Sequence, residues 1–311
     1  MDKNQADKSV KILPIFLFGM LAIAAVYALF ISFRDKKPQQ NLSISSKLIP
    51  ATEITHGHGM AVDVSDPNKL YIATHHGLFQ LINDKDLYQV GNNNNDYMGF
   101  SPDAKSSNTF FASGHPEAGG NIGFQKSEDG GLTWKTLSSG IGGPVDFHAL
   151  SVSPVNPNLV FGWYQGQVER SLDGGKTWEA FKNGFVIVGL AADTKDENIV
   201  YSITPQGNGV MASKDKGVTW NILSKDLQGG LTSAFAIDPS DSHKMLSYSE
   251  KLSLAKSSDS GATWQKINQS FEGDMLFIAY DRTQPSRVYG LTSNNALYKS
   301  INDGNTWLKI R

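Results

Sequence analysis

Six of the seven histidines of this 311-residue chain fall between residues 56 and 148. Imidazole is the most common metal ligand in proteins and the side chain best suited to move protons near neutral pH. The candidate metal ligands are His56, His58, His75, His76, His115 and His148. Two carboxylates of the same region, Glu117 and Asp146, are the candidate catalytic groups. A site of imidazole and carboxylate predicts a divalent ion, with zinc favoured and copper or nickel also suited to imidazole.

The spacing of these histidines restricts which of them can act together. His56 and His58 are two residues apart, so on an extended chain they project to the same side. His75 and His76 are adjacent and would project to opposite sides, so only one of them should face a common site. The alternative is that these are ordinary loop or buried, hydrogen-bonded histidines.

Composition excludes several classes of function. The chain has no cysteine, which rules out disulfides, thiolate metal ligands and a cysteine nucleophile. Its 28 basic and 30 acidic side chains give a formal net charge of −2. Because no excess of basic side chains is available to neutralise phosphates, we expect no nucleic-acid partner.

The elements that must position the histidines are repeats. The pattern S-x-D-x-G-x-T-W occurs at 127–134, 171–178, 213–220 and 257–264, and again at 300–307 with Asn in place of Asp. The tryptophans that end the five motifs are 42 to 44 residues apart. A second repeat, strand–turn–strand, aligns at 61–74, 150–163, 190–203, 235–248 and 278–291. A period in the forties with short strands is typical of propeller blades.

Counting a degenerate first repeat, the sequence predicts six repeats of four strands, A to D, at about 55–91, 96–138, 146–182, 186–224, 231–268 and 274–311. We therefore expect an all-β, six-bladed propeller of four-stranded antiparallel blades, with seven blades as the alternative. Residues 47–51 should add an outer strand or a cover at the seam between the first and last blades.

The S-x-D-x-G-x-T-W motif resembles the Asp box, or bacterial neuraminidase repeat, of the sialidase superfamily. Similar motifs occur in bacterial propellers named as glycosyl hydrolases and, more distantly, in sortilin-type and photosystem II assembly propellers. The resemblance implies that Asp129, Asp173, Asp215, Asp259 and Asn302 are structural residues of the turn between strands C and D. Physical chemistry agrees, because a short carboxylate in a tight turn accepts the backbone N–H groups of that turn.

In a propeller the A–B and C–D loops emerge on one face, and the B–C loops and D–A links on the other. The repeated motifs make the first face a scaffold, so binding residues should lie on the second, which we call the upper face. All histidines except His243 fall on it. The candidate ligand-binding residues there are Asp96, Tyr97, Trp163, Tyr164 and Gln165.

Sialidase chemistry is not expected. Sialidases of this superfamily use an arginine cluster, and only Arg170 of the five arginines is positioned by sequence to approach the upper face. Two hypotheses remain open. The chain is either a binding or assembly module that takes a metal, a glycan or an extracytoplasmic protein, or a glycosyl-hydrolase-like enzyme that uses the same face. Fold resemblance does not choose between them.

Residues 12–33 contain no charged side chain over 22 positions, enough for a helix to cross a bilayer core. This apolar run exceeds that of a cleaved signal peptide. The expected organisation is an N-terminal tail (1–11), a transmembrane anchor (12–33), a polar linker (34–46) and the propeller (47–311). We expect a single-pass membrane protein with the propeller outside the cytoplasm.

This topology can be tested with protease added to intact spheroplasts. The C-terminal domain should be digested while a cytoplasmic marker survives. A propeller that stays protected until the cells are lysed would contradict the orientation.

Overall fold

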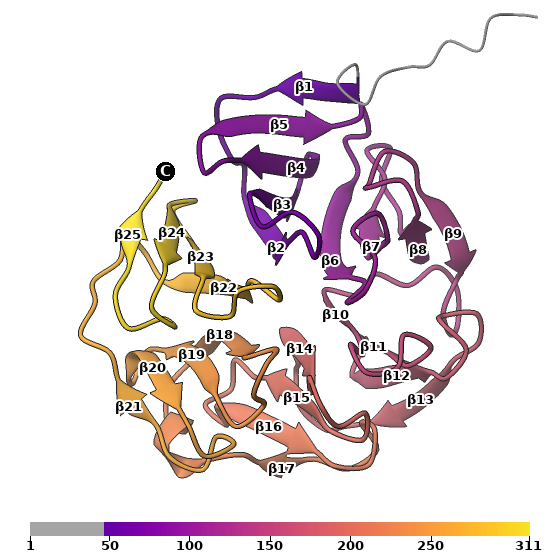
Figure 1. Ribbon diagram of the computed structural model, residues 1–311. Helices are drawn as coiled ribbons and strands as arrows, with labels where there is room; N and C mark the ends of the chain where they lie inside the picture. Colours follow the sequence, from indigo (N-terminus) through magenta and orange to yellow (C-terminus); the bar gives the residue numbers. More distant parts are fainter. Residues whose placement is uncertain (1–46) are drawn as a thin grey trace, which may run out of the picture. The chain divides into compact units, whose positions relative to one another are not determined.

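The computed structural model describes residues 47–311, which form six antiparallel sheets arranged in a ring (Figure 1). The prediction of an all-β, six-bladed propeller is confirmed, and the seven-bladed alternative is wrong. Within residues 47–311 no helix is long and apolar enough to cross a membrane. The predicted anchor at 12–33 lies outside the described residues and stays a prediction.

Each blade is one contiguous stretch of chain, with its first strand nearest the axis of the ring (Figure 1). Blade 1 comprises β2 (Gly57–Val62), β3 (Lys69–Thr74), β4 (Gly77–Ile82) and β5 (Asp86–Val90). Blade 2 comprises β6 (Asp96–Pro102), β7 (Phe110–His115), β8 (Phe124–Ser127) and β9 (Lys135–Ser138). Blade 3 comprises β10 (Ala149–Val152), β11 (Val160–Tyr164), β12 (Gln167–Ser171) and β13 (Glu179–Lys182). Blade 4 comprises β14 (Gly189–Ala192), β15 (Val200–Ile203), β16 (Val210–Ser213) and β17 (Asn221–Ile222). Blade 5 comprises β18 (Thr232–Ile237), β19 (Met245–Ser249), β20 (Ser253–Ser257) and β21 (Gln265–Lys266). Blade 6 comprises β22 (Met275–Tyr280), β23 (Val288–Thr292), β24 (Leu297–Ser300) and β25 (Leu308–Lys309). A 3₁₀ turn, η2 (Lys225–Leu227), follows blade 4.

Blade 1 carries a fifth strand. β1 (Leu48–Pro50) pairs antiparallel with β5, so that Leu48 lies opposite Val90 and Pro50 opposite Tyr88. The outer strand predicted at 47–51 is therefore present. A proline is tolerated there because β1 is the edge of the sheet, where one row of N–H groups has no strand partner.

The ring closes between blades 1 and 6 without a shared strand. Buried side chains of β2 to β5 pack directly against Tyr289, Leu291 and Leu297 of blade 6. Polar contacts reinforce this seam: the Tyr289 hydroxyl donates to Asp84 Oδ1 at 2.8 Å, and Lys299 forms an ion pair with the same carboxylate. Closure therefore depends on side-chain packing rather than on strand exchange.

The two turns on the scaffold face are joined in every blade. A backbone N–H of each C–D turn donates to a backbone carbonyl of the A–B turn of the same blade, at 2.8 to 3.0 Å. In blade 3, for example, Gly174 N–H donates to Asn158 O. These bonds fix both turns on one side of the ring and leave the B–C loops and D–A links on the other.

The repeated aspartates are occupied within their own turns. Asp173 Oδ1 accepts from the Ser171 hydroxyl and from Thr177 N–H, and Oδ2 accepts from the Thr177 hydroxyl at 2.7 Å. These bonds lower the pKa of the Asp173 carboxyl, the Thr177 backbone bond most of all. Gly175 follows at φ +88°, and an added Cβ there would lie 2.0 Å from Phe124 of the preceding blade. The motif thus builds a turn and also packs against the neighbouring blade.

Asn302 makes the corresponding hydrogen bonds in the last blade, with the direction of one of them reversed. Its Oδ1 accepts from Ser300 Oγ and Thr306 N–H, while its Nδ2 donates to Thr306 Oγ1 at 2.9 Å. An amide can therefore replace the carboxylate, provided that the threonine hydroxyl becomes the acceptor.

We expect Asp173→Ala to lower the Tm by several degrees, because Thr177 N–H and both hydroxyls lose their acceptor. Asp173→Asn is the matched control and should retain most of the stability, as Asn302 does naturally. Calorimetry of both variants is the measurement. Equal Tm values for Asp173→Ala and the unmodified protein would contradict this role.

A buried carboxyl connects blades 2 and 3. Glu169 on β12 is 1% exposed, and its Oε2 accepts from Ile141 N–H at 3.0 Å. Burial raises the pKa of Glu169 from 4.5 to about 7, against the opposing effect of the Ile141 bond. In the unfolded chain the carboxyl loses its proton near its ordinary value. The contribution of protonated Glu169 to the free energy of unfolding is therefore fully present below about pH 4.5, and it is lost as the pH rises through about 7.

Glu169→Gln removes this titration and keeps an acceptor for Ile141 N–H. The variant should match the unmodified protein near pH 4.5 and exceed its stability at pH 8 by roughly 1–3 kcal/mol. Chemical unfolding at both pH values measures the difference, with Glu53→Gln at an exposed position as the control. A stability difference independent of pH would contradict a buried, protonated Glu169.

Candidate functional site

The candidate site lies where the inner strands of blades 1 to 3 begin. The pairing of β2 with β3 shifts register between Gly57 and Gly59, which places His58 in a β-bulge. The pairing of β6 with β7 shifts register between Asp96 and Gly99, directly after the pair Asp96–His115. Bulges of this kind redirect side chains and are frequent beside functional sites.

The first group of imidazoles, the His58 cluster, consists of His56, His58 and His75, with Asp96 beside them. His58 Nε2 lies 3.2 Å from both ring nitrogens of His75, and His56 stacks against His75 at a ring separation of 5.3 Å. His75 Nδ1 lies 2.7 Å from Asp96 Oδ2. Atoms of the three histidines suited to bind a metal all fall within 4.8 Å of one another.

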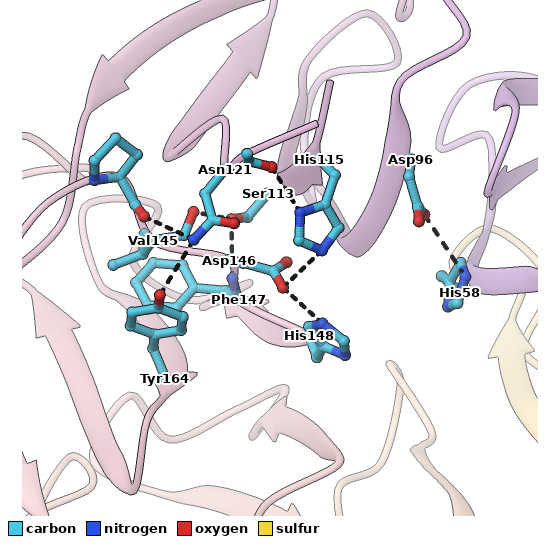
Figure 2. Close-up of polar contacts among 12 residues, drawn as sticks. His58, Asp96, Ser113, His115, Asn121, Val145, Asp146, Phe147, His148 and Tyr164 are labelled. Carbon is cyan, nitrogen blue, oxygen red and sulfur yellow. Dashed lines mark hydrogen bonds and ion pairs between the residues drawn. The ribbon is translucent and has the colours of Figure 1, made fainter. Parts of the chain in front are cut away.

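The second group, the Asp146 cluster, consists of His115, Asp146 and His148. Figure 2 shows Asp146 between the two imidazoles, with the Asp96–His58 pair in the same view. Asp146 Oδ2 lies 2.7 Å from His148 Nε2 and 3.1 Å from His115 Nε2. The other ring nitrogen of His115, Nδ1, lies 2.7 Å from the Gly120 carbonyl oxygen. This cluster also satisfies the distances of a metal site.

The electrostatic environments of two of these histidines differ. Burial, and then the neighbouring His75, lower the pKa of His58 to about 4, so His58 is neutral at physiological pH. The hydrogen bond to Asp146 raises the pKa of His148. The upper face therefore carries one neutral, buried imidazole close to an imidazole that holds its proton more firmly.

A pocket of about 420 Å³, the central pocket, opens beside both clusters. Its lining comes from five blades, which places it at the axis of the ring. Polar, aromatic and aliphatic residues all line it: His58, Met98, Asp146, His148, Trp163, Tyr164, Gln165, Val186, Ile187, Val188 and Phe277. Val186 and Val188 are exposed apolar side chains, 36% and 45% accessible.

The aromatic part of the central pocket is held by hydrogen bonds. Trp163 Nε1–H donates to Asn183 Oδ1 at 3.2 Å, and the Tyr164 hydroxyl accepts from Asn121 and Gln165. Gln165 has φ +48° and precedes Gly166 at φ +84°, so the two form a turn with left-handed residues at both central positions. Such a conformation is unfavourable for glutamine and is concentrated at functional sites.

A second, more open depression, the rim pocket, also contacts both clusters. His75, Asp96, His115 and Glu117 line it together with His76. Glu117 is exposed and belongs to this pocket, whereas Asp146 belongs to the central pocket. The two candidate catalytic carboxylates therefore serve different depressions.

The structure refines the sequence-based site in three ways. The histidines form two clusters, whereas a single convergent group was predicted. Of the adjacent pair, His75 and not His76 joins a cluster. Tyr97 is completely buried and packs against Trp134 at a ring separation of 4.8 Å, so it presents no accessible surface to a ligand in this structure. Its direction follows from the strand, because Asp96 and Tyr97 are neighbours on β6 and project to opposite sides.

The expected lack of a sialidase arginine cluster holds for the described residues. None of the four arginines of 47–311 lines the central or the rim pocket. Arg170 instead pairs with Glu179 at 2.7 Å and lies over the Phe181 ring, on the outer strands of blade 3. Its predicted approach to the upper face is wrong.

The fold and the pockets define a six-bladed propeller whose upper face carries histidines, carboxylates and the half-buried aromatic side chains Trp163 and Tyr164. No family model matches the chain. A curated relative, a xyloglucanase of Hypocrea jecorina (strain QM6a), is 27% identical over 237 residues. The match covers 63% of this chain and 25% of that enzyme, so the chain spans about a quarter of this relative's length.

Solved structures show the same fold. A GH74 enzyme of Niastella koreensis aligns over 81% of this chain and 46% of its own, with a TM-score of 0.56 and 15% identity. YCF48 from Cyanidioschyzon merolae aligns over 85% of this chain and 87% of its own, with a TM-score of 0.55 and 14% identity. The predicted resemblance to glycosyl-hydrolase and assembly propellers is thus confirmed as a resemblance of fold.

Proposed function

We propose that the upper face binds a polysaccharide chain, with the central pocket as its main contact. The observation that carries this proposal is the pocket itself, which is lined by Trp163 and Tyr164 as well as by Asp146 and His148. Sugar rings present apolar C–H faces that pack on aromatic side chains and hydroxyls that need hydrogen-bond partners, and this pocket offers both. The similarity to a xyloglucanase supports a β-glucan as the ligand class.

A second candidate function is hydrolysis of the bound glycan. Two carboxylates from neighbouring blades, Asp96 and Asp146, contact imidazoles on the upper face. Glycosidases of both stereochemical types use a pair of carboxyl groups that flank the scissile bond. In this scheme Asp146, which lines the pocket, acts on the glycosidic bond. His148 carries a proton that its hydrogen bond to Asp146 stabilises, since that bond raises the pKa of His148.

We further propose that residues 12–33 anchor the protein in a membrane, with the propeller outside the cytoplasm. The support is the uninterrupted apolar run of 22 residues and the polar segment that separates it from the propeller. A tethered propeller of this kind would meet its glycan at the cell surface.

Affinity electrophoresis of the full chain in gels containing xyloglucan tests the binding proposal. We expect retardation, and about tenfold weaker binding for Trp163→Ala, equivalent to a loss of roughly 1.4 kcal/mol. Leu172→Ala, at an exposed apolar position on the scaffold face, is the matched control and should bind normally. Unretarded migration on xyloglucan and other β-glucans would refute the glycan ligand.

Release of reducing ends from the same polysaccharide separates binding from catalysis. If the chain is an enzyme, Asp146→Asn should abolish the release while retaining most of the binding. Retardation without release of reducing ends would leave the protein a glycan-binding module and refute the hydrolase.

A further inference from the structure

We infer that the upper face holds two separate divalent-cation sites, one in each histidine cluster, and that Asp146 and Asp96 have different roles in them. Asp146 is a ligand in its site, whereas Asp96 is a positioning residue that orients His75 in the other. This inference does not rest on the glycan proposal, because zinc binding is measured without any glycan. Asp146 and His148, which also appear in the hydrolysis scheme, are here assigned as ligands.

The Asp146 cluster contains a contact that a neutral imidazole does not satisfy. His115 Nδ1 lies 2.7 Å from the Gly120 carbonyl oxygen, which can only accept, so Nδ1 carries the proton. Nε2 of a neutral His115 then directs a lone pair at Asp146 Oδ2, 3.1 Å away. Either a proton on Nε2 or a cation bound to both atoms would complete this contact, and we assign the cation.

The remaining atoms of this cluster fit the same cation. His148 Nε2 lies 2.7 Å from the same carboxylate oxygen. A cation would replace the proton that otherwise joins these two atoms, so two imidazoles and one carboxylate converge on it. The Asp146 side chain is only 10% exposed, and its Oδ1 is buried without a hydrogen-bond partner among residues 47–311. An ionised carboxylate buried in this way is costly unless a charge compensates it. The bond from His115 Nδ1–H to a carbonyl is also the outer-shell contact that metal-binding histidines usually make.

The His58 cluster is arranged differently. His75 Nδ1 lies 2.7 Å from Asp96 Oδ2, and an ionised carboxylate only accepts, so His75 Nδ1 donates. His75 Nε2 is then the lone-pair nitrogen, and it lies 3.2 Å from His58 Nε2. Two imidazole nitrogens at this separation can bind one ion with bonds of about 2.0–2.1 Å, with His56 as the third ligand. A carboxylate behind a metal-binding histidine fixes the tautomer and raises the basicity of the ligand, which is the role we assign to Asp96.

The two sites are neighbours on the upper face. His58 shares the central pocket with Asp146 and His148, while His75 and Asp96 share the rim pocket with His115. Imidazole and carboxylate donors suit zinc, and three protein ligands leave a coordination position open to an oxygen of a bound ligand.

The test is a zinc titration of the full chain after treatment with a chelator, followed by calorimetry or by competition with a chromogenic chelator. The unmodified protein should bind two equivalents. His58→Ala and Asp146→Asn should each bind one, and the double variant none. Asp96→Asn should still bind two, one of them 10- to 100-fold more weakly.

Two histidine variants are controls. His76→Ala changes the neighbour of His75 that joins no cluster, and His243→Ala changes the scaffold face, where His243 pairs with Asp241. Both should bind two equivalents, and circular dichroism should show the same fold for all variants. The visible spectrum of bound Co²⁺ would identify the site that each variant has lost.

Three results would overturn the inference. Binding of fewer than two equivalents by the unmodified protein refutes the pair of sites. Retention of both equivalents by His58→Ala or by Asp146→Asn refutes the assigned ligands. Complete loss of one equivalent in Asp96→Asn refutes the positioning role and makes Asp96 a ligand.

Discussion

The hydrogen bond between the A–B and C–D turns is the constraint on which the rest of the propeller depends. It recurs in all six blades, and each time it joins the repeated motif to the turn that follows the innermost strand. Because the two turns are hydrogen-bonded to each other on one face, their polar side chains bond within the turns, as the Asp173 carboxylate does with Thr177. On the opposite face no backbone bond between loop and link recurs in all six blades of residues 47–311. A B–C loop N–H donates to the link before the first strand in blades 1, 5 and 6, so these loops can differ from blade to blade. Six of the seven histidines, together with Trp163 and Tyr164, occupy that face.

The number of blades could be predicted because its signal is periodic. Tryptophans 42 to 44 residues apart, each at the end of the same motif, determine one hairpin per blade regardless of the loops between them. Ring topology then placed His58 and His148 close together, although they are 90 positions apart. The outer strand at Leu48–Pro50 was also predictable, since its sequence aligns with the fourth strand of other blades.

The division of the site into two clusters could not be predicted in this way. It depends on bulges at His58 and after Asp96. A bulge turns single side chains away from the alternating directions of a regular strand, so the strand pattern alone does not predict where they point. Glycines on both sides of His58 are the only sequence signal for its bulge. The pairing of Asp146 with His148 was accessible, because residues two apart on an extended chain project to the same side. The contact of His115 with the Gly120 carbonyl depends on a loop conformation, and no motif indicates it.

The seam between blades 1 and 6 has a consequence for the order of folding. Apart from β1, which pairs with β5, the strands of each blade pair with their neighbours in sequence, so a blade can form from contacts over about 40 residues. The bonds that close the ring, such as Tyr289 to Asp84, join residues more than 200 positions apart. Contacts of that range require closure of a long loop, so they form late. The two histidine clusters use only blades 1 to 3 and can assemble before the ring closes. The central pocket takes walls from His58 on one side of the seam and Phe277 on the other, and it exists only in the completed ring.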